Sequence, residues 1–283
     1  MDGGGGRRAA PAAHGVRSAK PRPTLRRKSM RNEKAGRSAL IGGMLAASAI
    51  GAAWAVDARR RSDRLRRTHR ILVDLLLNAL TADDPVTARH SRRVADLSYA
   101  LAEAVGMRGS ELTTLRVAAL LHDLGKIDDR FWHIVHSRKR LTPEERSKIE
   151  QHPDQSARIL EPLGAIHPGL DAIVASHHEC WDGDGYPAGL RGDAIPLGAR
   201  IIAIADVFDA LTQPRKYRDP LAPEDAIEKL VEGSGRQFDP ALVELVSAPH
   251  FRESWFELAR RGLADEESMD ECDKSMVEHS EER

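Results

Sequence analysis

The sequence predicts an all-helical fold, and three observations support that prediction. Hydrophobic residues make up 41% of the 283-residue chain, but aromatic residues make up only 4%. The apolar residues are mostly Leu, Ala, Ile and Val, and they recur at helical spacing through the middle of the chain. No stretch shows the sustained alternation of apolar and polar residues that is typical of a half-buried strand. The length suits one domain of ordinary size with extensions at its ends.

The two ends of the chain carry opposite charge. Residues 1–70 contain 18 basic and four acidic residues, whereas residues 264–283 contain nine acidic and two basic ones. Residues 1–37 also hold a glycine run and several prolines, a composition that cannot bury enough apolar surface to offset the entropy of ordering. We therefore expect a disordered basic leader over residues 1–37 and an acidic tail that is disordered after residue 263. No nucleic-acid motif accompanies the basic leader, so a nucleic-acid partner is not expected.

An uncharged run, ALIGGMLAASAIGAAWAV, occupies residues 39–56. Its length approaches the roughly 20 residues that a helix needs to cross a bilayer. Because Ala and Gly dominate it and basic clusters flank both sides, a membrane span and a peripheral or soluble leader are equally compatible with it. If the run inserts, the basic linker at residues 58–64 would lie at the cytoplasmic face. The only cysteines are Cys180 and Cys272, which excludes a disulfide framework and favours the cytoplasm.

The first predicted helix follows Asp63. Its apolar residues share a helical spacing: Leu65, Leu72, Leu75, Leu76 and Leu80. It should end near Asp84, because Pro85 disfavours helical backbone in the residue before it.

A second helix follows, with Asp84 or Thr87 as its cap and Gly106 as its stop. Its apolar face is formed by Val94, Leu97, Leu101 and Val105. Further helices are predicted over residues 110–124, 142–151, 155–160, 170–178, 197–211, 223–232 and 240–246.

The most informative stretch is HHECWDGDGYP at residues 177–187, which sets two adjacent imidazoles beside a glycine-rich turn. His122 and Asp123 form a second pair of potential ligands. Further upstream and downstream, His90, His152 and Asp206 offer the same donor types, which suit a multinuclear metal centre. About 100° of helical rotation would separate His122 from Asp123, so the pair can address two metals rather than chelate one.

The motifs and their order resemble the HD-GYP domain family, the HD-superfamily phosphohydrolases that open the bacterial second messenger cyclic di-GMP. Six elements occur in one order: DPVTARHSRRV at 84–94, HDLGKI at 122–127, His152-Pro153, the 177–187 block, IADVFDALT at 204–212, and FDP at 238–240. The resemblance covers about Leu65 to Val246. It implies an HD-superfamily helical bundle over residues 65–250, preceded by the leader, an apolar segment at 38–57 and the linker, and followed by an extension at 251–283.

The resemblance also implies the chemistry of the site. It assigns Asp123 as a bridge between two metal ions, iron or manganese, within a ligand set of His90, His122, Asp123, His152, His177, His178 and Asp206. Lys126 and Asp84 would assist catalysis, Tyr186 would lie at the rim, and Arg215 and Arg218 would hold substrate phosphates. Some relatives bind a third metal through a glutamate where this chain has Val86. The expected product is therefore the linear dinucleotide pGpG rather than GMP.

Two alternatives stay open at this point. The chain could be an HD phosphohydrolase of another nucleotide, or a module that senses cyclic di-GMP or docks to a diguanylate cyclase through the Gly-Tyr-Pro loop with little turnover. Members of the family that are interpreted as binding modules lack ligands, whereas all seven positions are filled here. Other expectations are a homodimer and attachment of a cytoplasmic catalytic domain to the inner face of the cell membrane by residues 39–56.

Overall fold

The computed structural model describes residues 51–65, 67–68, 71–78, 85–128, 131, 134, 141–214 and 218–264. Contacts divide the chain into two units, residues 1–68 and 69–283. In the first unit, residues 51–65 form a helix with exposed side chains. The predicted leader, most of the uncharged run at 39–56 and the acidic tail lie outside the described residues. Within the described ranges, no helix is both long and apolar enough to cross a membrane.

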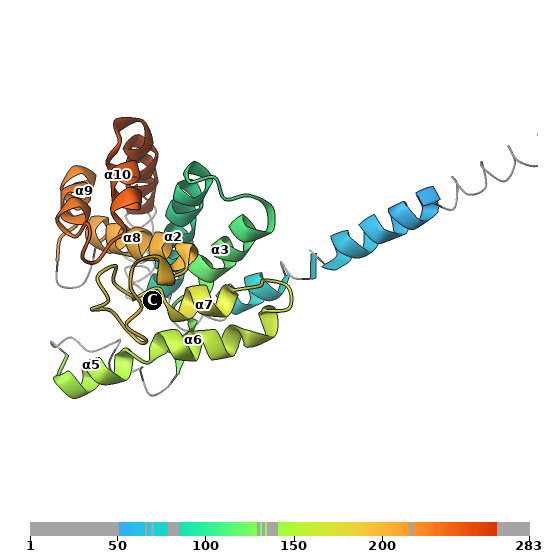
Figure 1. Cartoon of the computed structure of the whole chain (residues 1–283), viewed down its shortest axis with the longest axis horizontal. Helices are drawn as coiled ribbons and strands as arrows, with labels where there is room; N and C mark the ends of the chain where they lie inside the picture. Colours follow the sequence, from blue (N-terminus) through green and yellow to red (C-terminus); the bar gives the residue numbers. More distant parts are fainter. Residues whose placement is uncertain are drawn as a thin grey trace, which may run out of the picture. The chain divides into compact units, whose positions relative to one another are not determined.

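The second unit is helical, as predicted, and its described residues form no strand (Figure 1). After a helix at residues 71–78 come α2 (Pro85–Ala104), α3 (Gly109–Leu121), α5 (Pro143–Ile149), α6 (His152–Leu160), α7 (Leu170–Ala175), α8 (Leu197–Thr212), α9 (Pro223–Glu232), α10 (Pro240–Ser247) and a last helix at residues 249–264. Three short 3₁₀ turns lie between them: η1 (Leu124–Ile127), η2 (Glu161–Leu163) and η3 (Gly192–Ala194).

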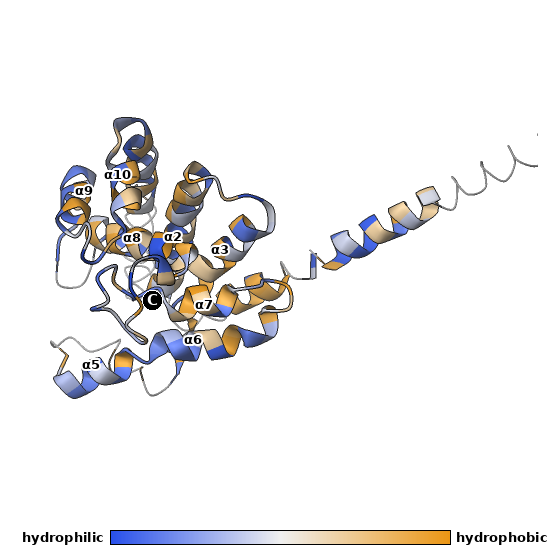
Figure 2. Ribbon diagram, in the orientation of Figure 1, coloured by the Kyte–Doolittle hydropathy of each residue, from blue (hydrophilic) through white to orange (hydrophobic). Residues whose placement is uncertain are grey.

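Helices α2 and α8 form the centre of the bundle. Helix α2 packs against α3 and α8, while α9 packs against α8 and α10. On the other side, α6 packs against α7 and η1, and α7 contacts α3 and α8. Leu101, Leu115 and Phe208 are fully buried where these helices meet. Hydrophobic residues lie on the inward faces of the helices, whereas α5 at the edge of the bundle is largely hydrophilic and buries no residue (Figure 2).

Helix α2 has the apolar face and the end that its sequence predicts. Val94, Leu97 and Leu101 are buried along that face. Beyond the helix, Gly106 has a φ of 91°, a left-handed conformation that favours glycine. Its N–H donates to the carbonyl of Glu103, and the N–H of Met107 donates to that of Ala102, the paired bonds that close a helix C-terminus.

The helix at residues 71–78 turns a different face to the core from the one predicted. Val73 and Leu77 are buried, whereas Leu72 and Leu75 are 42% and 62% exposed. The segment is apolar on more than one side, so leucine spacing identifies a helix without deciding which side the bundle covers. Packing against the rest of the unit makes that choice.

The helix at residues 249–264 belongs to the packed unit. Phe251, Trp255 and Phe256 are buried in the same core cluster as α2 and α8. The indole N–H of Trp255 donates to the carbonyl of Leu97 at 3.2 Å, and its ring centroid lies 4.8 Å from that of Phe208. The predicted boundary at residue 250 therefore falls inside the bundle, because the sequence motifs end before this helix begins.

We predict that Trp255→Ala lowers the free energy of unfolding of the bundle by about 3–5 kcal/mol, because it removes a fully buried indole and leaves a cavity between α2 and α8. Chemical denaturation followed by far-UV circular dichroism measures this change. Trp54→Ala is the matched control, since Trp54 is 71% exposed and its loss should change the unfolding free energy by no more than about 0.5 kcal/mol. Equal effects of the two substitutions would contradict the role assigned to the last helix.

Candidate metal centre

The His122–Asp123 pair lies where α3 ends. The helix is apolar and buried along most of its length, and its last residue is Leu121. His122 still has helical dihedral angles, but Asp123 has φ −95° and ψ 6° and begins the η1 turn. The pair therefore lies at a helix end rather than within a helix, as the predicted range 110–124 would have placed it. Both side chains are buried.

Three histidines share one local geometry. The Nδ1 atom of His122 lies 2.8 Å from the carbonyl of Ala119, and those of His152 and His177 lie 2.6 Å from the carbonyls of Ile149 and Val174. Each acceptor is the carbonyl three residues earlier, so each Nδ1 is the protonated donor. A neutral imidazole carries one N–H, and each Nε2 is therefore left with a free lone pair.

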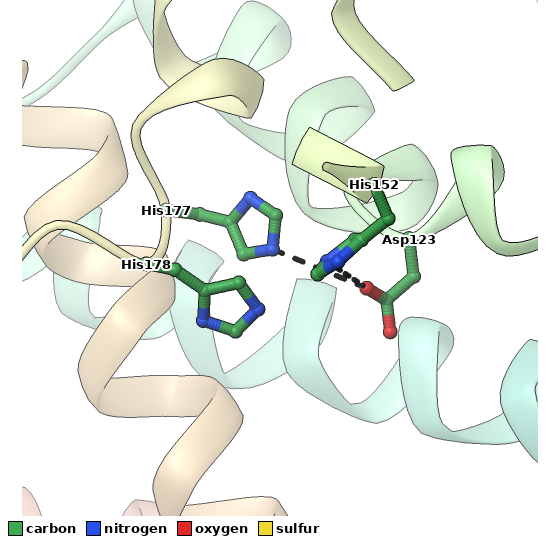
Figure 3. Close-up of side chains that lie close together, drawn as sticks. All are labelled: Asp123, His152, His177 and His178. Atoms are coloured by element: carbon green, nitrogen blue, oxygen red, sulfur yellow. Dashed lines mark ion pairs between the residues drawn. The ribbon is translucent and has the colours of Figure 1, made fainter. Parts of the chain in front are cut away.

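His177 and His178 lie in a turn beyond α7. The helix ends at Ala175, three residues earlier than predicted, and Ser176 leaves the helical conformation. This early end turns both imidazoles towards His152 and Asp123 (Figure 3). His152 is itself the first residue of α6, so ligands from three separate segments meet at one point.

The lone pairs of Asp123, His152 and His177 face one another without a proton between them. The Nε2 of His152 lies 3.1 Å from Oδ1 of Asp123, and the Nε2 of His177 lies 4.0 Å from the same oxygen. Because each Nδ1 holds the proton of its ring, neither Nε2 can donate to the carboxylate. These three atoms are buried and have no hydrogen-bond partner. The same holds for Nε2 of His122. Buried acceptors in this arrangement repel one another unless a cation lies among them, so the residues fit a metal ion.

The seven predicted ligands form two groups that could each hold a metal ion. Asp123, His152, His177 and His178 form the first, and His90, His122 and Asp206 form the second, with the ligand atoms of each group within 4.8 Å of one another. Asp123 faces both, since its Oδ2 lies 3.4 Å from Nε2 of His122 while Oδ1 faces the first group. A carboxylate between two such groups has the position of a bridging ligand.

Electrostatics hold the first group in the protonation states that a metal requires. Burial alone would raise the pKa of Asp123, but the charge of Lys126 holds that pKa well below its usual range. Burial lowers the pKa of His177 far below 6.5, and the neighbouring imidazoles lower it further. Burial also lowers the pKa of His178 to about 3. Near neutral pH the carboxylate is ionised and these two rings are neutral.

The second group is held by a carboxylate that the sequence analysis did not select. Nδ1 of His90 lies 2.7 Å from Oδ2 of Asp209, while Nε2 of His90 lies 3.1 Å from Oδ1 of Asp206. Arg93 donates to both oxygens of Asp209, from Nε at 2.7 Å and from Nη2 at 3.2 Å. Asp209 is buried and lies one turn after Asp206 on α8. It therefore orients the His90 ring, and its spacing from Asp206 is the only signal of this in the sequence.

Gly125 lets η1 approach α6. Its N–H donates to Oγ of Ser156 at 2.8 Å. A Cβ atom here would meet the carbonyl oxygen of His152 at 2.5 Å and the backbone nitrogen of Ser156 at 2.7 Å. Any side chain would push the two segments apart, and with them Asp123 and His152. The glycine of the HDLGK motif is therefore a requirement of close packing.

Glu179 fixes the Gly-Tyr-Pro loop beside the metal groups. Its buried carboxylate accepts from the N–H of Ala188 at 2.7 Å and from that of Leu190 at 3.0 Å. Gly185 passes so close to this residue that a Cβ atom would lie 2.6 Å from its Cα. Tyr186 consequently lies over His178, with ring centroids 5.0 Å apart. No short motif predicts this role of Glu179, because its partners follow it by nine and eleven residues.

A pocket of about 260 Å³ opens beside the metal groups. The turn at His177 and His178, the Gly-Tyr-Pro loop and the Asp206 region of α8 form three of its sides. Arg146 of α5 and Glu150, which follows the last residue of that helix, line it as well, although no sequence motif indicates either of them. The other lining residues include Cys180, Ala203, Val207 and Gln237.

The remaining predicted site residues differ in where they lie. Lys126 is beside the metal groups, with Nζ 2.6 Å from Oδ2 of Asp123. Tyr186 lines the pocket. Arg218 is exposed, donates to the carbonyl of Ala210, and is absent from the described residues that line the pocket. Asp84 and Arg215 lie outside the described residues.

One family model and several curated proteins match this chain. The family model described as HD domain matches residues 74–242. A 3'3'-cGAMP-specific phosphodiesterase 2 of Vibrio cholerae is 41% identical over 185 residues, which are 64% of this chain and 35% of that protein. A cyclic di-GMP phosphodiesterase of Thermotoga maritima is 40% identical over 173 residues, 60% of this chain and 46% of that protein. The chain thus spans less than half the length of either relative.

A solved structure shows a partial likeness. The crystal structure of a cyclic GMP-AMP specific phosphodiesterase of V. cholerae aligns with 68% of this chain and 53% of its own, with a TM-score of 0.49 and 23% sequence identity.

We predict that Asp209→Asn weakens metal binding by the His90 group about 10- to 100-fold, because an uncharged amide no longer holds the His90 ring as a carboxylate does. Titration of the metal-free chain with Mn²⁺, followed by calorimetry, measures the affinity. Asp96→Asn is the control, since Asp96 pairs with Arg116 at an exposed site away from both groups. An unchanged affinity in Asp209→Asn would show that the carboxylate does not support the ligand.

We also predict that metal uptake by the His90 group releases about one proton per chain near neutral pH. Burial would lower the pKa of His90, but Asp206 and Asp209 raise it from 6.5 to about 9, so the metal-free ring holds a proton that a metal ion must displace. The extra stability that this proton gives the metal-free fold is complete below pH 6.5 and is lost as the pH rises through about 9. The proton release should vanish above that pH as well.

Calorimetry of metal binding in buffers with different ionisation enthalpies counts these protons. A binding heat that is independent of the buffer near neutral pH would contradict the predicted protonation of His90.

Proposed function

The chain belongs to the HD domain family, and from this membership and the geometry of the two ligand groups we propose that it is a metal-dependent phosphohydrolase that opens a phosphodiester bond of cyclic di-GMP. One observation carries the proposal: a buried, ionised carboxylate, Asp123, faces the orphaned Nε2 atoms of His122, His152 and His177, beside a pocket that His177, His178 and Asp206 line. This arrangement suits two divalent ions, which would neutralise charge on phosphoryl oxygens and lower the pKa of coordinated water.

The proposed ligands are the seven residues of the two groups. Mixed imidazole and carboxylate donors suit iron or manganese better than magnesium, which prefers oxygen ligands alone. We therefore propose two iron or manganese ions per chain. Asp209 and Arg93 keep His90 in place, and the backbone carbonyls behind His122, His152 and His177 keep their Nε2 atoms directed inward.

Lys126 and Tyr186 supply further groups for the reaction. The Lys126 ammonium lies 2.6 Å from Asp123 and is about one-quarter exposed, so it can reach a substrate phosphate and offset charge there or protonate the leaving oxygen. Burial and the nearby carboxylate of Asp123 raise the pKa of Tyr186, so its hydroxyl stays protonated and can donate to a phosphate oxygen. Hydrolysis of one phosphodiester bond adds a hydroxyl group to phosphorus and a proton to the leaving oxygen, which gives the linear dinucleotide.

A second substrate, 3'3'-cGAMP, is favoured by one specific observation. The V. cholerae relative at 41% identity is a cGAMP-specific phosphodiesterase, whereas the T. maritima relative at 40% acts on cyclic di-GMP. Both ligands contain guanine and two phosphodiester bonds, so the ligand groups alone do not distinguish them.

Other expectations from the sequence stay predictions. They are the catalytic role of Asp84, phosphate binding by Arg215 and Arg218, docking of a diguanylate cyclase on the Gly-Tyr-Pro loop, a homodimer, and attachment of a cytoplasmic catalytic unit to the membrane by residues 39–56.

Hydrolysis of cyclic di-GMP and 3'3'-cGAMP by the full chain, loaded anaerobically with Mn²⁺ or Fe²⁺ and followed by chromatography, tests the proposal. We expect linear dinucleotide from the wild-type chain and at least about a 1,000-fold lower rate from His122→Ala combined with Asp123→Ala, because both groups lose a ligand. Asp96→Asn is the control, because it removes an exposed carboxylate that belongs to neither ligand group. A metal-loaded wild-type chain that hydrolyses neither substrate would refute the proposal.

A further inference from the structure

Helix α5 contributes two charged side chains to the pocket that the metal groups and the Gly-Tyr-Pro loop do not explain. Arg146 and Glu150 are one helical turn apart and both line the cavity. Among the described residues, neither side chain forms an ion pair or a hydrogen bond, although residues at this spacing on a helix often pair. Neither ligand group includes Glu150. A carboxylate beside a site for a doubly negative substrate is unfavourable unless it has a partner in that substrate.

The size of the pocket limits that partner to part of the substrate. The cavity holds about 260 Å³, which is below the roughly 300–1,000 Å³ of pockets that enclose a whole drug-sized ligand. A cyclic dinucleotide with one phosphate at the metal groups can therefore place one nucleotide in the pocket. Arg146 and Glu150 line the same cavity as His177 and Asp206, so the non-phosphate part of that nucleotide would come within reach of them.

We propose that Glu150 selects guanine over adenine at this position, an inference that rests on the proposed hydrolysis of a cyclic dinucleotide. An ionised carboxylate has two acceptor oxygens and no donor. Guanine presents two adjacent donors, N1–H and the 2-amino group, which match those oxygens. Adenine presents the 6-amino donor next to the N1 acceptor, so one carboxylate oxygen would face a lone pair.

The surroundings of Glu150 support such a contact. Glu150 is half-buried at the C-terminal end of α5, so its contact with a base would be partly shielded from water. Arg146 places a positive charge in the same cavity. This charge offsets the repulsion between the Glu150 carboxylate and an anionic substrate. Tyr186 offers an aromatic ring at the pocket wall for the face of a base.

The substitution Glu150→Gln tests the proposal through a change of preference. A glutamine amide has one acceptor and one donor side by side, which matches the 6-amino and N1 groups of adenine and mismatches guanine. In the full chain, the ratio of kcat/KM for cyclic di-GMP to that for cyclic di-AMP should fall about 10- to 100-fold relative to wild type, the discrimination of one bidentate base contact.

Glu144→Gln is the matched control. It removes a carboxylate from the same helix, but Glu144 is exposed and does not line the pocket, so the ratio should stay at its wild-type value. An unchanged ratio in Glu150→Gln, with hydrolysis retained, would overturn the proposal.

Equilibrium binding of the two dinucleotides separates this inference from the proposed function. If the wild-type chain hydrolyses neither dinucleotide, the proposed function fails. The base contact is then tested by binding alone, through the ratio of the Kd values for cyclic di-GMP and cyclic di-AMP in wild type compared with the same ratio in Glu150→Gln. A lower preference for guanine in the variant supports the role of Glu150, and an equal preference overturns it. A wild-type chain that binds neither dinucleotide overturns both statements.

Discussion

The buried carboxylate of Asp123 is the constraint on which the rest of the site depends. It is removed from water and ionised, with imidazole lone pairs on two sides and the ammonium of Lys126 on a third. Three segments of backbone keep the rings from turning away, because each Nδ1 is fixed to a carbonyl three residues earlier. Such a cluster of acceptors is unfavourable on its own. A bound cation resolves this, which links the stability of the site to its function.

Packing around the cluster follows from the need to bring its segments together. Gly125 allows η1 to lie against α6, and Asp209 with Arg93 joins α2 to α8 behind His90. Glu179 fixes the position of the Gly-Tyr-Pro loop, because its carboxylate accepts hydrogen bonds from the N–H groups of Ala188 and Leu190. These are contacts within the chain rather than with a substrate, but each fixes the position of a residue that could contact one.

The sequence motifs contain the residues of the two ligand groups, but they do not contain all of the residues that support those groups. His122, Asp123 and the His177–His178 pair stand in short motifs whose donor types are visible without a structure, and the structure brings all seven proposed ligands into two groups. Glu179, Glu150 and the helix containing Trp255 were missed because their contacts join residues that are distant in the chain or follow the last motif. The early end of α7 was also missed, since its apolar spacing does not mark where the turn begins.

If Asp123 joins two metal sites in one centre, both ions must lie within reach of its carboxylate. Anomalous diffraction from crystals of the manganese-loaded chain, collected on both sides of the metal absorption edge, locates the ions. We expect two ions per chain, roughly 3.5–4 Å apart, with one carboxylate oxygen of Asp123 on each or one shared between them. A single ion, or two ions of which neither contacts Asp123, would contradict this expectation.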